Sequence, residues 1–283
     1  MSNLTYPQKE NAMNKAHHLI VVSICLLLFS CSEQQPTQSV KDAVVTEKSN
    51  QDSCELTVGW EPWEPYMYLT PGNEVSGLDI EIIKALAEEN KCQIEFIQGD
   101  WKSLLEMVED GEVDIVAGAS ISPSREKYAL FSDAYRNEDF VLYVRAAEFD
   151  NYGKTLQEVL DTQKIFGITA DYIYGGGLDK FIDDPYYSKL FIASDFGEMN
   201  YYNLLQHKVD LFVEDPFVGA YNLNRKGLNK QIKALPVVIH SGEVHLMFSK
   251  LSMYPQQVGM FNAALSKIKK NGSYQAILDK YQQ

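Results

Sequence analysis

Apolar and polar positions follow two different periods in the first half of the chain. Three short apolar runs have the length of buried strands and span 55–60, 93–98 and 113–120. Between them, 78–90 and 101–110 carry apolar residues at helical spacing, and Gly111 ends the second of these segments. This alternation predicts parallel strands joined by crossover helices, on which ligands bind outside the carboxyl ends of the strands.

A second unit of the same kind follows residue 145. Its predicted helices span 156–161, 201–208 and 216–227, and its predicted strands span 164–169 and 209–215. Extended apolar segments at 140–145 and 237–250 lead into this unit and back out of it, and a helix over 261–281 ends the chain. We therefore expect an α/β protein with two lobes, each a parallel-rich sheet flanked by helices, joined by two extended hinge crossings. The expected boundaries are 54–144 with 243–283 for lobe 1, and 145–242 for lobe 2.

The N-terminal region has the composition of an export signal. A basic start near Met13 precedes a short apolar run that ends in Leu28 to Cys31, and this "LFSC" resembles the lipobox of bacterial lipoproteins. We expect residues 1–30 to be an extension and signal peptide, with Met13 as an alternative start, and residues 31–53 to be a flexible tether. Lipidation of Cys31 would anchor the protein at the cell envelope, with ordinary secretion or a retained anchor as alternatives.

Charge and cysteine content narrow the function classes. The 283-residue chain has a formal net charge of -14, which argues against nucleic-acid binding. Cys54 and Cys92 each begin a predicted strand, and disulfides persist in exported proteins. If the two strands are parallel neighbours, their first residues lie side by side and a Cys54–Cys92 disulfide is feasible; two unrelated buried thiols are the alternative.

The order of several segments carries a family resemblance. "PWEPY", "GLDIEIIKAL", "LLEMVEDGEVDIVAGASISPSR", "FSDAY", "VDLFVEDPFVGAY" and "FNAALSKIKKNGSYQAILDKY" follow one another as they do in the bacterial extracellular solute-binding proteins of family 3. These are the polar amino-acid receptors of ABC importers, and the resemblance covers roughly residues 55 to 283. It implies the two-lobed periplasmic binding protein fold of type II, with the ligand in the cleft between the lobes.

The segment "SISPSR" predicts an anion site. Ser122 before Pro123 is typical of a helix N-cap followed by proline in the first helical position, and Arg125 presents paired donors that match a carboxylate. The resemblance implies that Ser120, Ser122 and Arg125 hold the α-carboxylate of an amino acid. The alternative is an ordinary cap with Arg125 paired to a surface glutamate.

The other candidate ligand residues come from both lobes. The resemblance assigns Trp63 a ring that packs on the ligand and assigns Asp215 the ammonium group, although a core tryptophan and a simple helix cap would look the same. Tyr66 fits either a core or a cleft position. Asp171 and Tyr172 are expected at the start of a cleft helix, where Asp171 is either a second negative charge or a solvated cap. We expect Trp60 and Trp101 to lie in the core. We expect the Glu214 side chain to point away from the cleft, and Glu61 or Glu64 to add negative charge near the ligand.

These observations lead to a receptor for a free α-amino acid with a polar or cationic side chain, which delivers it to an ABC permease. We expect a monomer without a cofactor. We also expect no metal site, because the histidines lack the spacing of metal ligands. Two alternatives remain open. One is an enzyme of the cyclohexadienyl dehydratase type with Asp171 or Asp179 as general acid, and the other is an amino-acid sensor that acts through a separate signalling partner.

Overall fold

A mixed sheet runs through the part of the chain that the computed structural model describes, residues 54–175 and 177–281. The nine strands of this sheet follow the order β4-β1-β5-β11-β7-β10-β8-β9, with β6 beside β11. The strands are β1 (Cys54–Trp60), β4 (Cys92–Gln98), β5 (Ile115–Ala119), β6 (Ala129–Phe131), β7 (Arg136–Arg145), β8 (Phe166–Thr169), β9 (Phe191–Ser194), β10 (Leu211–Glu214) and β11 (Ile232–Ser249). A separate small hairpin pairs β2 (Tyr68–Leu69) with β3 (Val75–Ser76).

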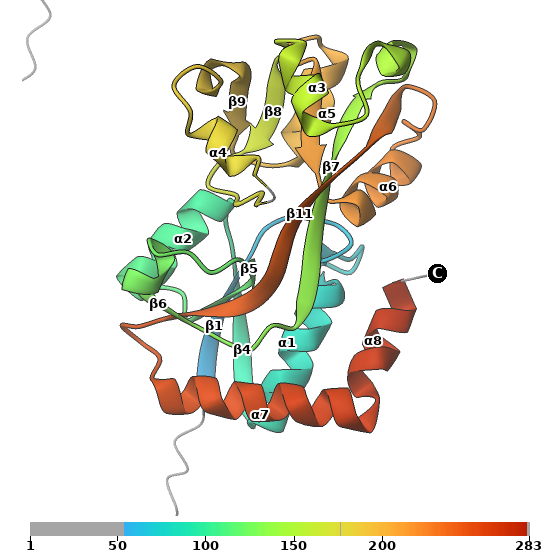
Figure 1. The fold of residues 1–283 in the computed structure, drawn as a ribbon. Helices are drawn as coiled ribbons and strands as arrows, with labels where there is room; N and C mark the ends of the chain where they lie inside the picture. The colour runs from blue at the N-terminus through green and yellow to red at the C-terminus, as the bar shows by residue number, and fades with distance from the viewer. Residues whose placement is uncertain (1–53, 176, 282–283) are drawn as a thin grey trace, which may run out of the picture. The chain divides into compact units, whose positions relative to one another are not determined.

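Helices flank the sheet in both halves of the chain (Figure 1). The α-helices are α1 (Leu78–Glu89), α2 (Trp101–Asp110), α3 (Leu156–Asp161), α4 (Asp179–Ile182), α5 (Glu198–Leu205), α6 (Pro216–Arg225), α7 (Pro255–Asn271) and α8 (Ser273–Tyr281). Three 3₁₀ turns are η1 (Arg125–Lys127), η2 (Ala146–Asn151) and η3 (Ser188–Leu190). Among the described residues, no helix combines the length and the apolar character that crossing a membrane requires.

Two lobes share this sheet. In the first lobe β1 pairs in parallel with β4 and β5, and in the second lobe β8 pairs in parallel with β9 and β10. Between them β7 and β11 run antiparallel, and β11 continues from the second lobe to the first, where it pairs with β5 and β6. Figure 1 shows these two long strands crossing between the lobes. The predicted two-lobed α/β fold with two extended crossings is confirmed.

Each lobe has its own core. Ile80, Ile83 and Phe248 belong to the cluster of the first lobe, and Phe140 and Phe166 belong to that of the second. Because β11 contributes Leu235 to one cluster and Phe248 to the other, the crossing strand is anchored at both ends. The expected boundaries at 144/145 and 242/243 stay a prediction. The predictions for residues 1–53, which include lipidation of Cys31, lie outside the described residues.

Most helices and strands occupy their predicted segments, and the departures have local causes. The expected terminal helix over 261–281 is two helices, because Gly272 adopts a left-handed φ of 85° between α7 and α8. Strand β9 was missed, since it has only four residues and their burial does not alternate. Gly111 ends α2 in the left-handed conformation, as predicted.

The predicted disulfide is confirmed. Cys54 and Cys92 are register partners at the first residues of the parallel strands β1 and β4, and their Cα atoms are 4.4 Å apart. The bond lies at the amino ends of these strands, which is the edge of the sheet opposite to the ligand-binding edge of such folds. It therefore stabilises the first lobe without taking part in the site.

Replacing both cysteines (Cys54→Ser with Cys92→Ser) should lower the free energy of unfolding. The disulfide closes a loop with a sequence separation of 38. In the chain-entropy treatment a loop of that length corresponds to about 4 kcal/mol. Urea unfolding of the oxidised protein and of the double variant measures the difference, and the wild-type protein under reducing conditions is the control. Equal unfolding midpoints for all three samples would contradict a stabilising role.

Candidate functional site

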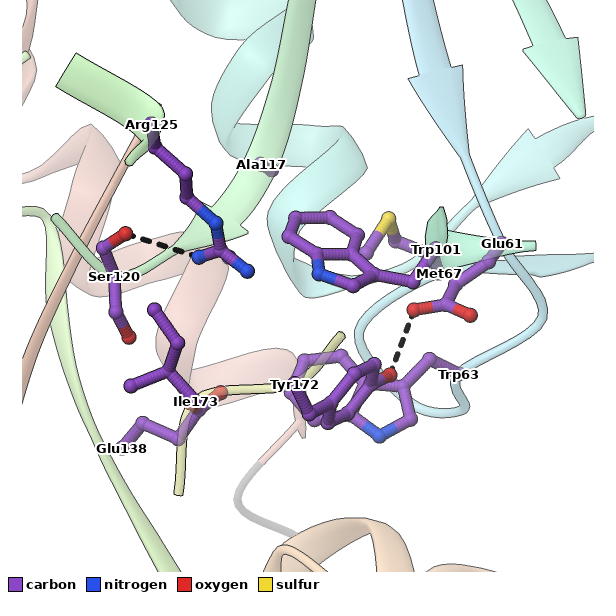
Figure 2. A pocket seen from close by; sticks show the side chains of 11 residues that line it. Glu61, Trp63, Met67, Trp101, Ala117, Ser120, Arg125, Glu138, Tyr172 and Ile173 are labelled. Carbon is purple, nitrogen blue, oxygen red and sulfur yellow. Dashed lines mark hydrogen bonds between the residues drawn. The ribbon is translucent and has the colours of Figure 1, made fainter. Parts of the chain in front are cut away.

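A small cavity lies where the two lobes meet (Figure 2). Its volume is about 20 Å³, which is room for one or two water molecules. The lining residues come from the loop after β1, the start of α2, the end of β5, η1, β7 and the loop after β8: Glu61, Trp63, Met67, Trp101, Ala117, Gly118, Ser120, Arg125, Glu138, Tyr172 and Ile173. The predicted location at the carboxyl ends of β1 and β5 is therefore where this cavity forms.

Arg125 reaches the cavity from a tight turn. Its side chain is buried, and its two terminal nitrogens donate hydrogen bonds to the backbone carbonyls of Ser120 (3.0 Å) and Asp171 (2.8 Å). The second of these bonds joins the first lobe to the second. The guanidinium also lies 5.4 Å from the centre of the Trp101 ring. Arg125 is thus not paired to a surface glutamate, which was the alternative reading of the sequence.

The helix expected after Ser122 is absent. Residues 125–127 form only the 3₁₀ turn η1, because the chain enters β6 at Ala129 and pairs there with β11. Ser122 still acts locally as a cap, since its Oγ accepts a hydrogen bond from the Arg125 amide at 3.3 Å. So short a turn adds little dipole to an anion site, and the positive charge there comes from Arg125 itself.

Ser120 and Ser122 face different spaces. Ser120 lines the small cavity, whereas Ser122 lines a neighbouring open groove of about 470 Å³ together with Asp171 and Asp179. Arg125 and Tyr172 border both spaces, so they form the wall between them. The cleft helix expected at Asp171 is absent as well: Asp171 sits in a turn with a left-handed φ of 60°.

Aromatic rings separate the two ends of the cavity. In the view of Figure 2, Arg125 and Ser120 lie on one side and Glu61 on the other, with the rings of Trp101 and Tyr172 between them. Trp63 and Trp101 each contact the Tyr172 ring edge to face, with centroids 6.1 Å apart. Trp60 is a core residue as expected, but Trp101 lines the cavity in addition to its core contacts.

Tyr66 and Asp215 lie behind the cavity wall. Asp215 caps α6, because its Oδ1 accepts from the amides of Phe217 (2.7 Å) and Val218 (3.0 Å). Its Oδ2 accepts a hydrogen bond from the Tyr66 hydroxyl at 3.3 Å. The predicted helix cap is thus present, and one carboxylate oxygen faces the first lobe.

Glu214 does not point away from the cleft. Its Oε1 accepts from Trp63 Nε1 across the lobe junction at 3.1 Å and from the Asp215 amide at 3.0 Å. The alternation of side chains along β10 suggested the opposite direction, but the strand ends at Glu214 and the backbone turns there into α6. Glu64, the other residue considered near Trp63, forms an ion pair with Arg225 of the second lobe at 2.6 Å.

Sequence reasoning missed an ion pair beside the cavity. Arg136 contacts Asp79 through two hydrogen bonds of 3.1 Å each, and its guanidinium lies 4.0 Å from the centre of the Tyr66 ring. Asp79 also accepts from the Tyr135 hydroxyl at 2.7 Å. Glu138 lies two residues further along β7, with its carboxyl 3.5 Å from Arg136 Nη1. The one available signal was a polar stretch, 136–139, with three charged residues directly before the apolar crossing segment 140–145.

Carboxyl groups outnumber cations at this junction. Among the described residues, the buried acids here are Glu61, Asp79, Glu138, Glu214 and Asp215, and the buried cations are Arg125 and Arg136. Burial raises the pKa of Glu61 to about 8 although the Tyr172 hydroxyl donates to it at 2.6 Å. Burial also raises the pKa of Glu138 and of Glu214 to about 8. Protons therefore balance the excess acid at neutral pH, and a cation that enters would compete with them.

Within residues 54–175 and 177–281, His, Cys, Asp and Glu side chains form no group of three that is arranged to hold a metal ion. What the geometry offers is a small space with a buried guanidinium, several carboxyl groups and aromatic walls. Such a space suits a small molecule that carries both charges.

Comparisons with known proteins point to one family. The sequence profile of bacterial extracellular solute-binding proteins, family 3, matches residues 56–283. A probable histidine-binding protein of Neisseria gonorrhoeae is 25% identical over 219 residues, which cover 77% of this chain and 78% of that protein. Cyclohexadienyl dehydratase of Pseudomonas aeruginosa is 25% identical over 166 residues, which cover 58% of each chain. Among solved structures, an ancestral arginine-binding protein bound to arginine is similar in fold, with a TM-score of 0.68, 23% identity and coverage of 80% of this chain and 97% of that one.

Changing Glu214 to glutamine should make stability less sensitive to pH. The folded protein holds a proton on Glu214 up to a pKa of about 8, whereas the unfolded chain loses that proton near the ordinary value of 4.5. Unfolding therefore releases a proton between these values, so this carboxyl lowers the free energy of unfolding as the pH rises through that window and has no further effect above it. The glutamine keeps the acceptor for Trp63 but cannot ionise.

Urea unfolding at about pH 5.5 and about pH 7.5 measures the effect. The loss of stability on raising the pH should be smaller in Glu214→Gln than in the wild type, by up to about 1.4 kcal/mol per pH unit. Glu88→Gln on the exposed face of α1 is the matched control. Parallel pH curves for the wild type and Glu214→Gln would show that Glu214 is ionised in the folded protein.

Proposed function

The chain belongs to the bacterial extracellular solute-binding proteins of family 3, and we propose that it captures a free α-amino acid in the cavity between its lobes and delivers it to an ABC permease. The observation that carries this proposal is the small cavity at the lobe junction, bordered by a buried arginine and by carboxyl groups of both lobes. A relative described as a probable histidine-binding protein supports an amino acid as the ligand.

The ligand carboxylate is assigned to Arg125 with Ser120 and Ser122. A guanidinium has five N–H groups, and two of those of Arg125 donate to backbone carbonyls, so three remain for a carboxylate. Ser120 lines the same space. Ser122 contributes by holding the Arg125 amide in its turn.

The ligand ammonium is assigned to the acidic groups of the junction, of which Asp215 is the one that the sequence indicated, and the aromatic residues surround the rest of the molecule. Asp215 Oδ2 becomes available when the Tyr66 hydroxyl turns away from it. Trp63 and Tyr172 supply apolar faces that shield the charges from water. The Asp171 backbone carbonyl accepts a hydrogen bond from Arg125. Asp171 also lines the outer groove, where its carboxylate favours cationic ligands.

Binding requires the lobes to move apart and close again. The present volume admits one or two water molecules, so an amino acid enters only when the contacts across the junction open. The crossings near residues 140–146 and 237–248 are the proposed hinges. Contacts such as those of Trp63 with Glu214 and of Arg125 with the Asp171 carbonyl would then be exchanged for contacts with the ligand.

The cellular setting follows from the family and from the N-terminal signal. Solute-binding proteins of this family act outside the cytoplasmic membrane, and we propose a monomer in the periplasm or cell envelope that is lipid-anchored at Cys31. Its partner would be the permease of an ABC importer. An amino-acid sensor acting through a separate signalling partner would use the same cavity. Uptake of labelled amino acid by cells with and without the protein separates import from sensing.

An enzyme is the second candidate. The similarity to cyclohexadienyl dehydratase, together with the protonated, buried Glu61 beside the cavity, supports a cleft in which an acid could donate a proton to a substrate. Asp171 and Asp179 lie in the outer groove, so they are less suited to this role than Glu61.

A thermal-shift screen of the common amino acids tests the proposed function. A ligand at a hundred times its dissociation constant stabilises the folded protein by about 2.7 kcal/mol, and the proposal expects the largest shifts from amino acids with polar or cationic side chains. Prephenate is assayed in parallel for turnover. Absence of any shift, combined with prephenate turnover, would replace the receptor by the dehydratase.

Replacing Arg125 by alanine should abolish ligand binding and leave the fold intact. The change removes the cation that faces the ligand carboxylate, and truncating one partner of a buried charge pair costs about 2–5 kcal/mol of affinity. Titration calorimetry with the amino acid found in the screen measures the loss. Arg125→Lys keeps the charge without the paired donors and should bind with intermediate affinity. Near-normal affinity of Arg125→Ala would remove this residue from the site.

A further inference from the structure

Glu138 is the acidic residue of β7 that faces the cavity directly. Its side chain is buried, with 5% of its surface exposed, and it borders the same space as Arg125, Ser120 and Ile173. Figure 2 shows it on the Arg125 side of the cavity, away from Glu61. We propose that Glu138 accepts the α-ammonium group of the bound amino acid directly, an inference that rests on the proposed function.

The shared cavity is the first argument. Arg125 and Glu138 both line this space, and the charge of Glu138 acts on Arg125. The carboxylate and the ammonium of an amino acid are attached to one carbon atom, so they require opposite charges that border the same space. Glu61 lies beyond the aromatic rings, at the end that the side chain of the ligand would reach.

The neighbours of Glu138 leave it able to bind a cation. Arg136 is its cationic neighbour on β7, but the 3.5 Å contact is long, and the same guanidinium is already held by two 3.1 Å hydrogen bonds to Asp79 of α1. The other charged groups that act on it are Asp215 at the start of α6, Asp79 of α1 and Arg125 of η1. Because Arg136 is shared with Asp79, an ammonium group would give Glu138 a cation of its own.

Asp215 is less directly placed. Its Oδ1 is occupied by the two amide hydrogen bonds of the α6 cap, its Oδ2 accepts from Tyr66, and its side chain does not line the cavity. Asp215 thus supports the ammonium site from behind, through Tyr66 and through its charge. Glu138 is placed for the direct contact, because it lines the cavity and Asp215 does not.

Proton release should accompany this contact. Burial raises the pKa of Glu138 to about 8, so the group is mostly protonated at pH 7 in the unliganded protein. A bound ammonium favours the ionised form, so binding displaces the proton and the affinity should rise with pH until about pH 8. The slope for one proton is at most about tenfold per pH unit.

The test compares amino acids with analogues that lack the α-amino group. L-Arginine is paired with δ-guanidinovalerate and L-histidine with imidazolepropionate, and the same pairing is made for any other amino acid that binds in the screen. The proteins are the wild type, Glu138→Gln, Asp215→Asn and the control Glu88→Gln, each checked for its fold by thermal melting. Wild type and control should prefer the amino acid over its analogue by about 30-fold or more, which is the lower end of the cost of an unpaired buried charge.

Glu138→Gln should lose most of that preference while it still binds the analogue as the wild type does. Calorimetry at pH 7 in two buffers of different ionisation enthalpy counts the protons, and Glu138→Gln should release about one fewer than the wild type. Asp215→Asn should keep the proton release of Glu138.

The outcomes separate the two proposals. If an amino acid binds and Glu138→Gln retains both the preference for the α-amino group and the proton release, Glu138 is not the acceptor and the receptor function stands. If the preference disappears in Asp215→Asn but not in Glu138→Gln, Asp215 is the acceptor. If no amino acid binds the wild type, the proposed function fails, and this inference fails with it.

Discussion

The ion pair between Arg136 and Asp79 is the interaction on which the wall of the cavity depends. Asp79 is completely buried in the first turn of α1, and Arg136 is the first residue of β7, so the pair ties a helix of the first lobe to a crossing strand. A buried charge without its partner is strongly destabilising, so neither residue can be changed alone without cost. The guanidinium also lies 4.0 Å from the centre of the Tyr66 ring and 5.4 Å from that of Trp63. It therefore determines where both rings stand, and with them the shape of the site.

Acid in excess of base gives this junction its chemical character. Arg136 is paired with Asp79. Among the described residues that border the cavity, Arg125 is then the remaining buried cation. The buried carboxyl groups of Glu61, Glu138 and Asp215 outnumber this single cation. Such a site holds protons when it is unliganded and exchanges them for a cation on binding. A ligand with only a carboxylate would satisfy Arg125 and leave the acids protonated. A ligand with an ammonium group as well uses both halves of the site, which is why an amino acid fits it better than a simple carboxylate.

The fold was predictable because its signals are local, whereas the centre of the site depends on contacts between distant segments. Helical and strand periodicities marked most elements, and matched strand starts pointed to the disulfide. Arg125 and Trp63 were found through the segments that flank them. Glu138 was not among the candidates, because its place at the cavity depends on β7 crossing the junction beside α1 and α6. The turn at Asp171 was mistaken for a helix start, since sequence does not reveal that its carbonyl accepts from Arg125.

The same groups hold the lobes together and are assigned to the ligand. Trp63 bonds to Glu214, Arg125 bonds to the carbonyl of Asp171, and the Tyr172 hydroxyl donates to Glu61, so each of these cross-lobe contacts uses a residue that lines or adjoins the cavity. A ligand can favour the closed arrangement only through contacts stronger than those it replaces. A guanidinium binds a carboxylate, which is also charged, more strongly than it binds a neutral backbone carbonyl. The ligand carboxylate therefore gains most at Arg125, and a molecule without that group has no comparable contact with which to reclose the lobes.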